Sequence, residues 1–114
     1  MININMWSGP RNISTALMRS FENRKDTKVC DEPFYAYYLK KTNLNHPMKD
    51  EIINHYHTNE DEVINLITRE DNNYKIFYQK HMTHHILDET RLDWIDKGIN
   101  CFLIRDPAKV IVSY

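Results

Sequence analysis

The chain has 114 residues, 41% of them hydrophobic and 27% charged, which is the composition of one small globular domain. Its 15 basic and 16 acidic residues give a formal net charge of -1 at pH 7, so we expect no general attraction to nucleic acid or to an anionic membrane. No apolar run is long enough to span a bilayer, and no basic segment leads into an apolar signal sequence. A cytoplasmic protein that holds any anion locally is therefore expected.

Strands and helices alternate along the first two thirds of the chain. Residues 2–7 are an apolar run typical of a strand, a turn follows at residues 8–10, and apolar residues at helical spacing predict a helix over residues 13–21. Residues 27–30 predict a second strand. Three helices are then predicted over residues 33–42, 46–57 and 59–71, the last of them capped by Asn59.

The remaining segments continue this alternation. Residues 74–79 predict a third strand, residues 88–98 a capped helix that Gly98 ends, and residues 99–104 a strand buried on both faces. Asp106 is expected to cap a final helix. The pattern predicts an α/β fold, a three-layer parallel sheet with helices on both faces. Because ligands bind at the carboxyl ends of such strands, residues 8–15, 80–85 and 105–113 are expected to meet at one edge.

The first of these segments has the order of a phosphate-binding loop, which is strand, turn and helix. It lacks the second glycine and the lysine that a nucleotide kinase requires, so ATP or GTP chemistry has little support. What remains is Arg11, a forked cationic donor, followed by Ser14 and Thr15 at a helix start whose free N–H groups favour an anion. The alternative is that Ser14 merely caps the helix and Arg11 is solvated.

The last segment supplies a second arrangement suited to an anion. Arg105 follows the final apolar run, and Ser113 stands eight positions later. Since eight residues are close to a whole number of helical turns, Ser113 is expected near the helix face on which the helix start points. A phosphate held by both residues is the function this spacing favours.

The strings “PRNIST” and “RDPAKVIVSY” resemble the two phosphate-binding motifs of the sulfotransferase superfamily, whose members transfer a sulfuryl group from 3′-phosphoadenosine 5′-phosphosulfate. The resemblance covers nearly the whole chain and implies a P-loop-like sulfotransferase fold. Two longer strings, “SGPRNISTALMRSFENRKDTKVCDEPFYAYYL” and “YQKHMTHHIL”, are similar to a bacterial sulfotransferase-like branch related to plant proteins labelled branched-chain aminotransferase-like. That label is not followed, because no feature indicates a pyridoxal phosphate site.

Position by position, the resemblance implies these nucleotide-binding residues: Arg11, Asn12, Ile13, Ser14, Thr15, Arg105 and Ser113. Arg11 would also touch the transferring group, which makes it a catalytic candidate, while Arg105 and Ser113 would hold the 3′-phosphate. Asn12 and Ile13 stand where the family usually has serine and glycine. Because a β-branched residue resists positive φ, Ile13 is expected to narrow the loop, with altered donor geometry or lost activity as the result.

The resemblance further implies a histidine base just past the third strand. His81 lies closest to the predicted strand end and is the expected catalytic base, with Lys80 beside it as a charge stabiliser. His84 and His85 follow. His81 and His85 would suit zinc if the segment were helical, but no third ligand of matching geometry is apparent, so no metal site is expected.

Tyrosines and carboxylates after the second strand are candidates for the acceptor site. Tyr35 or Tyr38 would line an acceptor pocket, although core packing is the simpler role for both. Asp31 and Glu32 end the second strand, and two adjacent carboxylates there are not expected to work as an acid/base pair, since neighbouring side chains in a strand point to opposite faces.

The sequence thus predicts a sulfotransferase that acts on a hydroxyl or amine of a small-molecule acceptor and needs no metal. Residues 1–114 are expected to be the N-terminal part of one larger sulfotransferase-like domain, because the chain stops within the helix that would hold the 3′-phosphate. The alternative function is a non-catalytic nucleotide-binding or interaction module whose loop has degenerated at Asn12 and Ile13.

Overall fold

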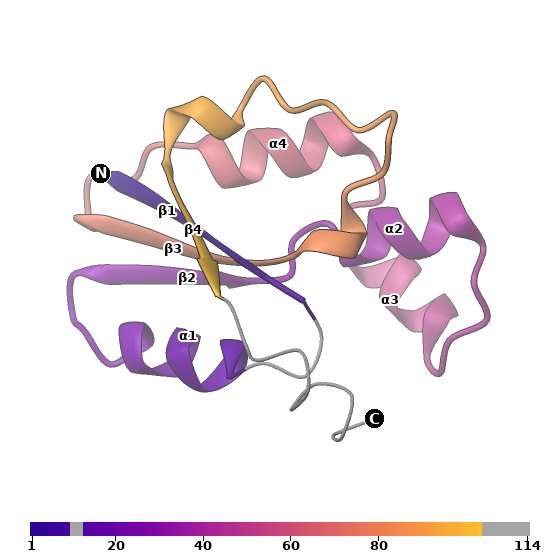
Figure 1. Cartoon of the computed structure of the whole chain (residues 1–114), viewed down its shortest axis with the longest axis horizontal. Coiled ribbons are helices and arrows are strands. Elements are labelled where there is room, and N and C mark those ends of the chain that lie inside the picture. The colour runs from indigo at the N-terminus through magenta and orange to yellow at the C-terminus, as the bar shows by residue number, and fades with distance from the viewer. Residues whose placement is uncertain (10–12, 104–114) are drawn as a thin grey trace.

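The computed structural model describes residues 1–9 and 13–103, which form a parallel sheet with helices on both faces (Figure 1). The strands are β1 (Ile2–Ser8), β2 (Thr27–Asp31), β3 (Ile76–Met82) and β4 (Ile99–Leu103). The α-helices are α1 (Ser14–Glu22), α2 (Tyr35–Thr42), α3 (Lys49–His55) and α4 (Glu60–Thr68). Two short 3₁₀ helices, η1 (Thr83–His85) and η2 (Ile95–Lys97), lie between β3 and β4.

The strand order is β2-β3-β1-β4, and every neighbouring pair is parallel. Helix α1 covers one face of the sheet and α4 the other, while α2 and α3 lie beyond the carboxyl end of β2 (Figure 1). The predicted three-layer α/β architecture is confirmed. The first, third and last strands are neighbours, as expected, so their carboxyl ends share one edge.

Strand β3 extends to Met82, past its predicted end at residue 79. Lys80 and His81 therefore lie within the strand rather than in the loop after it. Because neighbouring side chains in a strand point to opposite faces, these two residues are directed to different layers of the domain.

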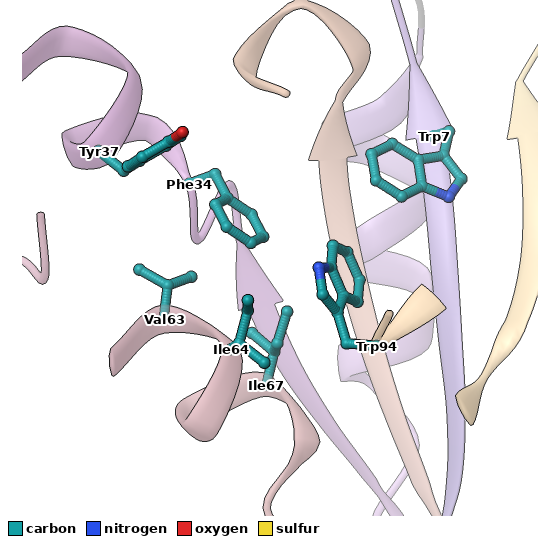
Figure 2. Packing of buried hydrophobic residues seen from close by; sticks show 7 residues of the cluster. All are labelled: Trp7, Phe34, Tyr37, Val63, Ile64, Ile67 and Trp94. Carbon is teal, nitrogen blue, oxygen red and sulfur yellow. The ribbon is translucent and has the colours of Figure 1, made fainter. Parts of the chain in front are cut away.

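The main core lies between the sheet and α4. Trp94 packs between Trp7 of β1 and Phe34, with ring centroids 6.0 Å and 5.5 Å away, and Ile64 and Ile67 of α4 belong to the same cluster (Figure 2). Burying large rings of this kind contributes about 1.5–3 kcal/mol each. This cluster fixes the chain that follows β3 against the sheet.

The helix predicted over residues 88–98 is wrong, since only η2 forms there. Side chains in this segment bond to local backbone instead, which competes with a helix. Leu87 N donates to Thr90 Oγ1 at 3.0 Å, and Trp94 Nε1 donates to Arg91 O at 2.7 Å. Gly98 does end the helical turn, as the C-cap of η2, and it also allows close packing, because a Cβ there would lie 2.9 Å from Asn3 O.

The prediction that the last strand is buried on both faces is also wrong for β4. Ile99 is 54% exposed and Phe102 is 67% exposed. β4 lies at the end of the strand order found among the described residues, and the edge of a sheet has fewer neighbours to cover it.

The predicted cap of α4 is confirmed, because Asn59 Oδ1 accepts hydrogen bonds from Asp61 N at 2.8 Å and Glu62 N at 3.4 Å. Helix α3 is shorter than predicted and has no buried residue. No helix in the described part of the chain is long and apolar enough to cross a membrane. The helix expected after residue 105 lies outside the described residues.

Candidate active site

The carboxyl ends of β1 and β3 form the point at which the sheet connections reverse direction. β1 leads through α1 to β2, beyond β3, whereas β3 leads to β4 on the far side of β1. Ser8 at the end of β1 pairs in register with Met82 at the end of β3. Such a switch point is where open α/β sheets bind ligands, so the two polar segments converge where a site is expected.

The start of α1 faces this edge with an ordinary backbone. Ile13 has φ -84° and ψ 28°, which any L-residue can adopt, so the expected obstacle of a β-branched residue at positive φ does not arise. Its side chain is 69% exposed. Ser14 is the first helical residue rather than the cap, and the Ile13 side chain makes no capping bond, so the capping alternative for Ser14 is wrong.

Lys80 brings a buried positive charge to the same place. Its side chain is 7% exposed, and its Nζ donates to Thr15 Oγ1 of α1 at 2.9 Å. The ammonium also lies 3.4 Å from Asp31 Oδ1 and 3.5 Å from Glu32 Oε2. Lys80 thus brings a cation to the start of α1, where two carboxylates share its charge.

Glu32 has an unusual conformation beside this lysine. Its φ is 48°, in the left-handed region that few residues other than glycine occupy. The strain is balanced by a hydrogen bond from Glu32 N to Lys80 O at 2.9 Å and by the ion pair to Lys80. Its other carboxylate oxygen, Oε1, lies 3.9 Å from His85 Nε2. Strain of this kind concentrates at functional sites, so Glu32 joins the candidate residues.

His81 lies in the core rather than in an open cleft. It is 2% exposed, its ring stacks on Trp7 with centroids 4.6 Å apart, and Phe34 and Trp94 pack around it. Its Nε2 is 3.0 Å from Gln79 Oε1. The role of His81 as base stays a prediction, and this position is unfavourable for direct contact with an acceptor.

His85 is buried next to Glu32. It stacks on Tyr35 at 5.1 Å and lies near Tyr38 and His84. Its Nδ1 is buried and has no hydrogen-bond partner among the described residues. Those residues also include no group of three or more His, Cys, Asp or Glu that could hold a metal ion.

Four of the predicted nucleotide-binding residues, Arg11, Asn12, Arg105 and Ser113, lie outside the described residues. The structure does bring together Thr15, Asp31, Glu32 and Lys80, for which the sequence predicts separate roles: donor binding for Thr15, charge stabilisation for Lys80 and the acceptor site for the two carboxylates. The signal for this convergence was present: Lys80 and Asp31 each stand at the end of a predicted strand, and parallel strands in register place such residues side by side.

Burial of the two histidines makes stability depend on pH. Burial, together with a smaller repulsion from His85, lowers the pKa of His81 to about 3, and burial lowers the pKa of His85 to about 3 as well. The unfolded chain binds these protons near pH 6.5, so the folded state loses stability below that pH, by up to about 1.4 kcal/mol per pH unit for each histidine.

We therefore expect the free energy of unfolding, measured by denaturant titration, to fall as the pH is lowered from 6.5 to 5. The variant His81→Gln should lose about half of that slope, because one of the two titrating groups is gone. A variant with the full slope would show that His81 titrates normally in the folded protein.

A comparison with known proteins adds independent information. A family model described as a sulfotransferase domain matches residues 2–114. Two curated relatives from Arabidopsis thaliana are “Branched-chain-amino-acid aminotransferase-like protein 1”, 35% identical over 111 residues, and “Branched-chain-amino-acid aminotransferase-like protein 2”, 34% identical over 111 residues. Each match covers 97% of this chain and 20% of the relative, so the chain spans about a fifth of their length. No solved structure matches significantly.

Proposed function

The chain belongs to the family of sulfotransferase domains, and from this premise we propose that it transfers a sulfuryl group from 3′-phosphoadenosine 5′-phosphosulfate to a hydroxyl or amine of a small molecule. The observation that carries the proposal is the buried Lys80 ammonium, 2.9 Å from Thr15 at the start of α1. Its place at the switch point of the sheet is where a transferring anionic group would lie. Cytoplasmic location remains part of this proposal.

The donor is proposed to bind along the edge formed by β1, β3 and β4. The backbone N–H groups at the start of α1, including those of Ile13, Ser14 and Thr15, would cradle the 5′-phosphosulfate. By the family resemblance, Arg11 and Asn12 would complete that cradle. Arg105 and Ser113 would hold the 3′-phosphate.

The proposed reaction exchanges one bond to sulfur for another. The bond between sulfur and the bridging phosphate oxygen breaks, a bond from sulfur to the acceptor oxygen or nitrogen forms, and adenosine 3′,5′-bisphosphate leaves with the bridging electron pair. Lys80 would stabilise the charge that grows on the bridging oxygen, as Arg11 would on the sulfuryl oxygens. The acceptor proton passes to a base.

Two residues compete for the role of base. The resemblance favours His81, but that ring is 2% exposed within the aromatic core. The geometry favours Glu32, whose carboxylate is 28% exposed, adjoins Lys80 and has a strained backbone that fixes its direction. A carboxylate so placed can accept the acceptor proton without any movement of the core.

The second candidate function, a non-catalytic nucleotide-binding module, is supported by the pairing of Lys80 with two carboxylates. An ion cluster of this kind also stabilises a fold without catalysis. Both functions include nucleotide binding, so they differ in turnover alone. A protein that binds adenosine 3′,5′-bisphosphate but releases none from the donor, whichever phenol or amine is offered, would be such a module.

Calorimetry with two nucleotides tests the shared premise. The protein is expected to bind adenosine 3′,5′-bisphosphate without metal, and at least about tenfold more tightly than ATP with magnesium, which corresponds to about 1.4 kcal/mol. The reason is that the loop lacks the lysine and second glycine with which a kinase binds a triphosphate. Tighter binding of ATP with magnesium would contradict both functions.

A further inference from the structure

A cavity of about 680 Å³ lies at the carboxyl end of β2, next to the ion cluster formed by Lys80, Asp31 and Glu32. Asp31 and Glu32 line the cavity and also hold the Lys80 ammonium, so the two sites share a wall. This volume is within the range of about 300–1,000 Å³ that small-molecule sites occupy. A compound in the cavity would have its end next to the residues proposed for the transfer.

The inner wall of the cavity is apolar. Val29 of β2, Ala36 of α2, and Val63 and Leu66 of α4 supply it. Tyr35, which the sequence put forward for an acceptor pocket, lies in the wall as well, and Tyr38 does not. Apolar side chains with an aromatic ring suit a flat, apolar body of one or two rings.

The polar part of the cavity has one sign of formal charge. Asp31 and Glu32 contribute two carboxylates, and no lysine or arginine is among the described lining residues. His55 and His57 also line the cavity, and His57 Nδ1 lies 2.9 Å from Glu62 Oε2. The Lys80 ammonium offsets part of the charge of these carboxylates. Its side chain is only 7% exposed, and Lys80 is not among the residues that line the cavity. An anionic compound would meet carboxylates at short range, whereas a neutral alcohol, phenol or amine would not.

The outer wall comes from the least packed helix of the fold. Ile52 and Tyr56, on α3 and directly after it, line the cavity, and α3 has no buried residue. The helix follows two residues in the left-handed region, Asn43 with φ 53° and Met48 with φ 62°. A wall with little buried area is the part that can adjust to ligands of different shape.

We propose that this cavity is the acceptor site, and that the acceptor is a neutral or cationic compound with an apolar body of one or two rings, not an anionic one. This inference rests on the proposed function, because the cavity can be an acceptor site only if the protein transfers a sulfuryl group. The acceptor hydroxyl or amine would lie at the Asp31–Glu32 wall, next to Lys80, with its rings between α2, α3 and α4.

Binding of 2-naphthol in the absence of any donor tests the site. Ile52→Trp places a larger side chain in the cavity from α3 and should weaken the affinity for 2-naphthol by about tenfold or more, because the indole occupies space that the ligand needs. Ile53→Trp is the matched control, because Ile53 has similar burial on the same helix and does not line the cavity. Equal affinities of the two variants, or no binding by the native chain, would overturn the proposal.

The charge preference is tested with 2-naphthoate, which has the same rings and a carboxylate. It should bind more weakly than 2-naphthol. Asp31→Asn should reduce the ratio of the two dissociation constants by about fivefold, as expected for removing one partly screened charge. A native chain that prefers 2-naphthoate would refute the charge argument. Because no donor is present, failure here is separate from failure of nucleotide binding, which would refute the proposed function instead.

Discussion

We expect the exchange Lys80→Met to lower the proposed turnover by about 10²–10³-fold, the cost of removing one pre-organised donor to developing charge. Methionine keeps an unbranched side chain, one atom shorter than that of lysine, and removes the ammonium that lies 2.9 Å from Thr15 Oγ1. The affinity for adenosine 3′,5′-bisphosphate should fall as well, because the bridging oxygen stays on this product with its charge, so only a loss of kcat marks a contribution of Lys80 to the transition state. Turnover is measured as release of this product from the donor with 2-naphthol as acceptor.

Loss of structure must be separated from loss of chemistry in this experiment. Asp31 and Glu32 are 44% and 28% exposed, so water can solvate both carboxylates once Lys80 is gone, and the fold should survive. Lys28→Met is the control, because the Lys28 ammonium lies 4.8 Å from the centre of the Phe77 ring, away from the site. A Lys80→Met protein that is folded and fully active would leave the cluster with a structural role only.

The order of strands and helices was predictable because the local patterns were strong. The apolar run at residues 2–7 and the cap at Asn59 both act within a few residues of themselves, and both predictions hold. The helix predicted over residues 88–98 fails for the opposite reason. There Thr90 and Trp94 bond to nearby backbone and pack on the core, and neither interaction is visible in helical periodicity.

The site was less predictable because strand boundaries decide which way side chains point. With the third strand ending at residue 79, Lys80 and His81 would both be in a loop and free to face the ligand. The strand in fact includes both, so Lys80 points to the start of α1 and His81 to the aromatic core. The resemblance implied a histidine base, and the geometry adds Glu32, which the sequence marked only as a candidate for the acceptor site.

The exchange Glu32→Gln should lower turnover by about 10²-fold or more, because an amide cannot take up the acceptor proton. Nucleotide affinity should change little, since Glu32 is proposed to contact the acceptor and not the donor. The matched comparison is His81→Gln, which removes the other candidate base and keeps an amide able to bond with Gln79. Both variants are assayed for turnover, for adenosine 3′,5′-bisphosphate affinity and for free energy of unfolding.

The three measurements separate the two bases because each role has its own signature. If Glu32 is the base, Glu32→Gln loses turnover at nearly full stability, whereas His81→Gln loses stability and keeps its turnover per folded molecule. This follows from the burial of His81, which packs at 4.6 Å on Trp7 and contributes to the core. If His81→Gln instead removes turnover at full stability, the histidine is the base, and the core around it must open during each reaction to admit the acceptor.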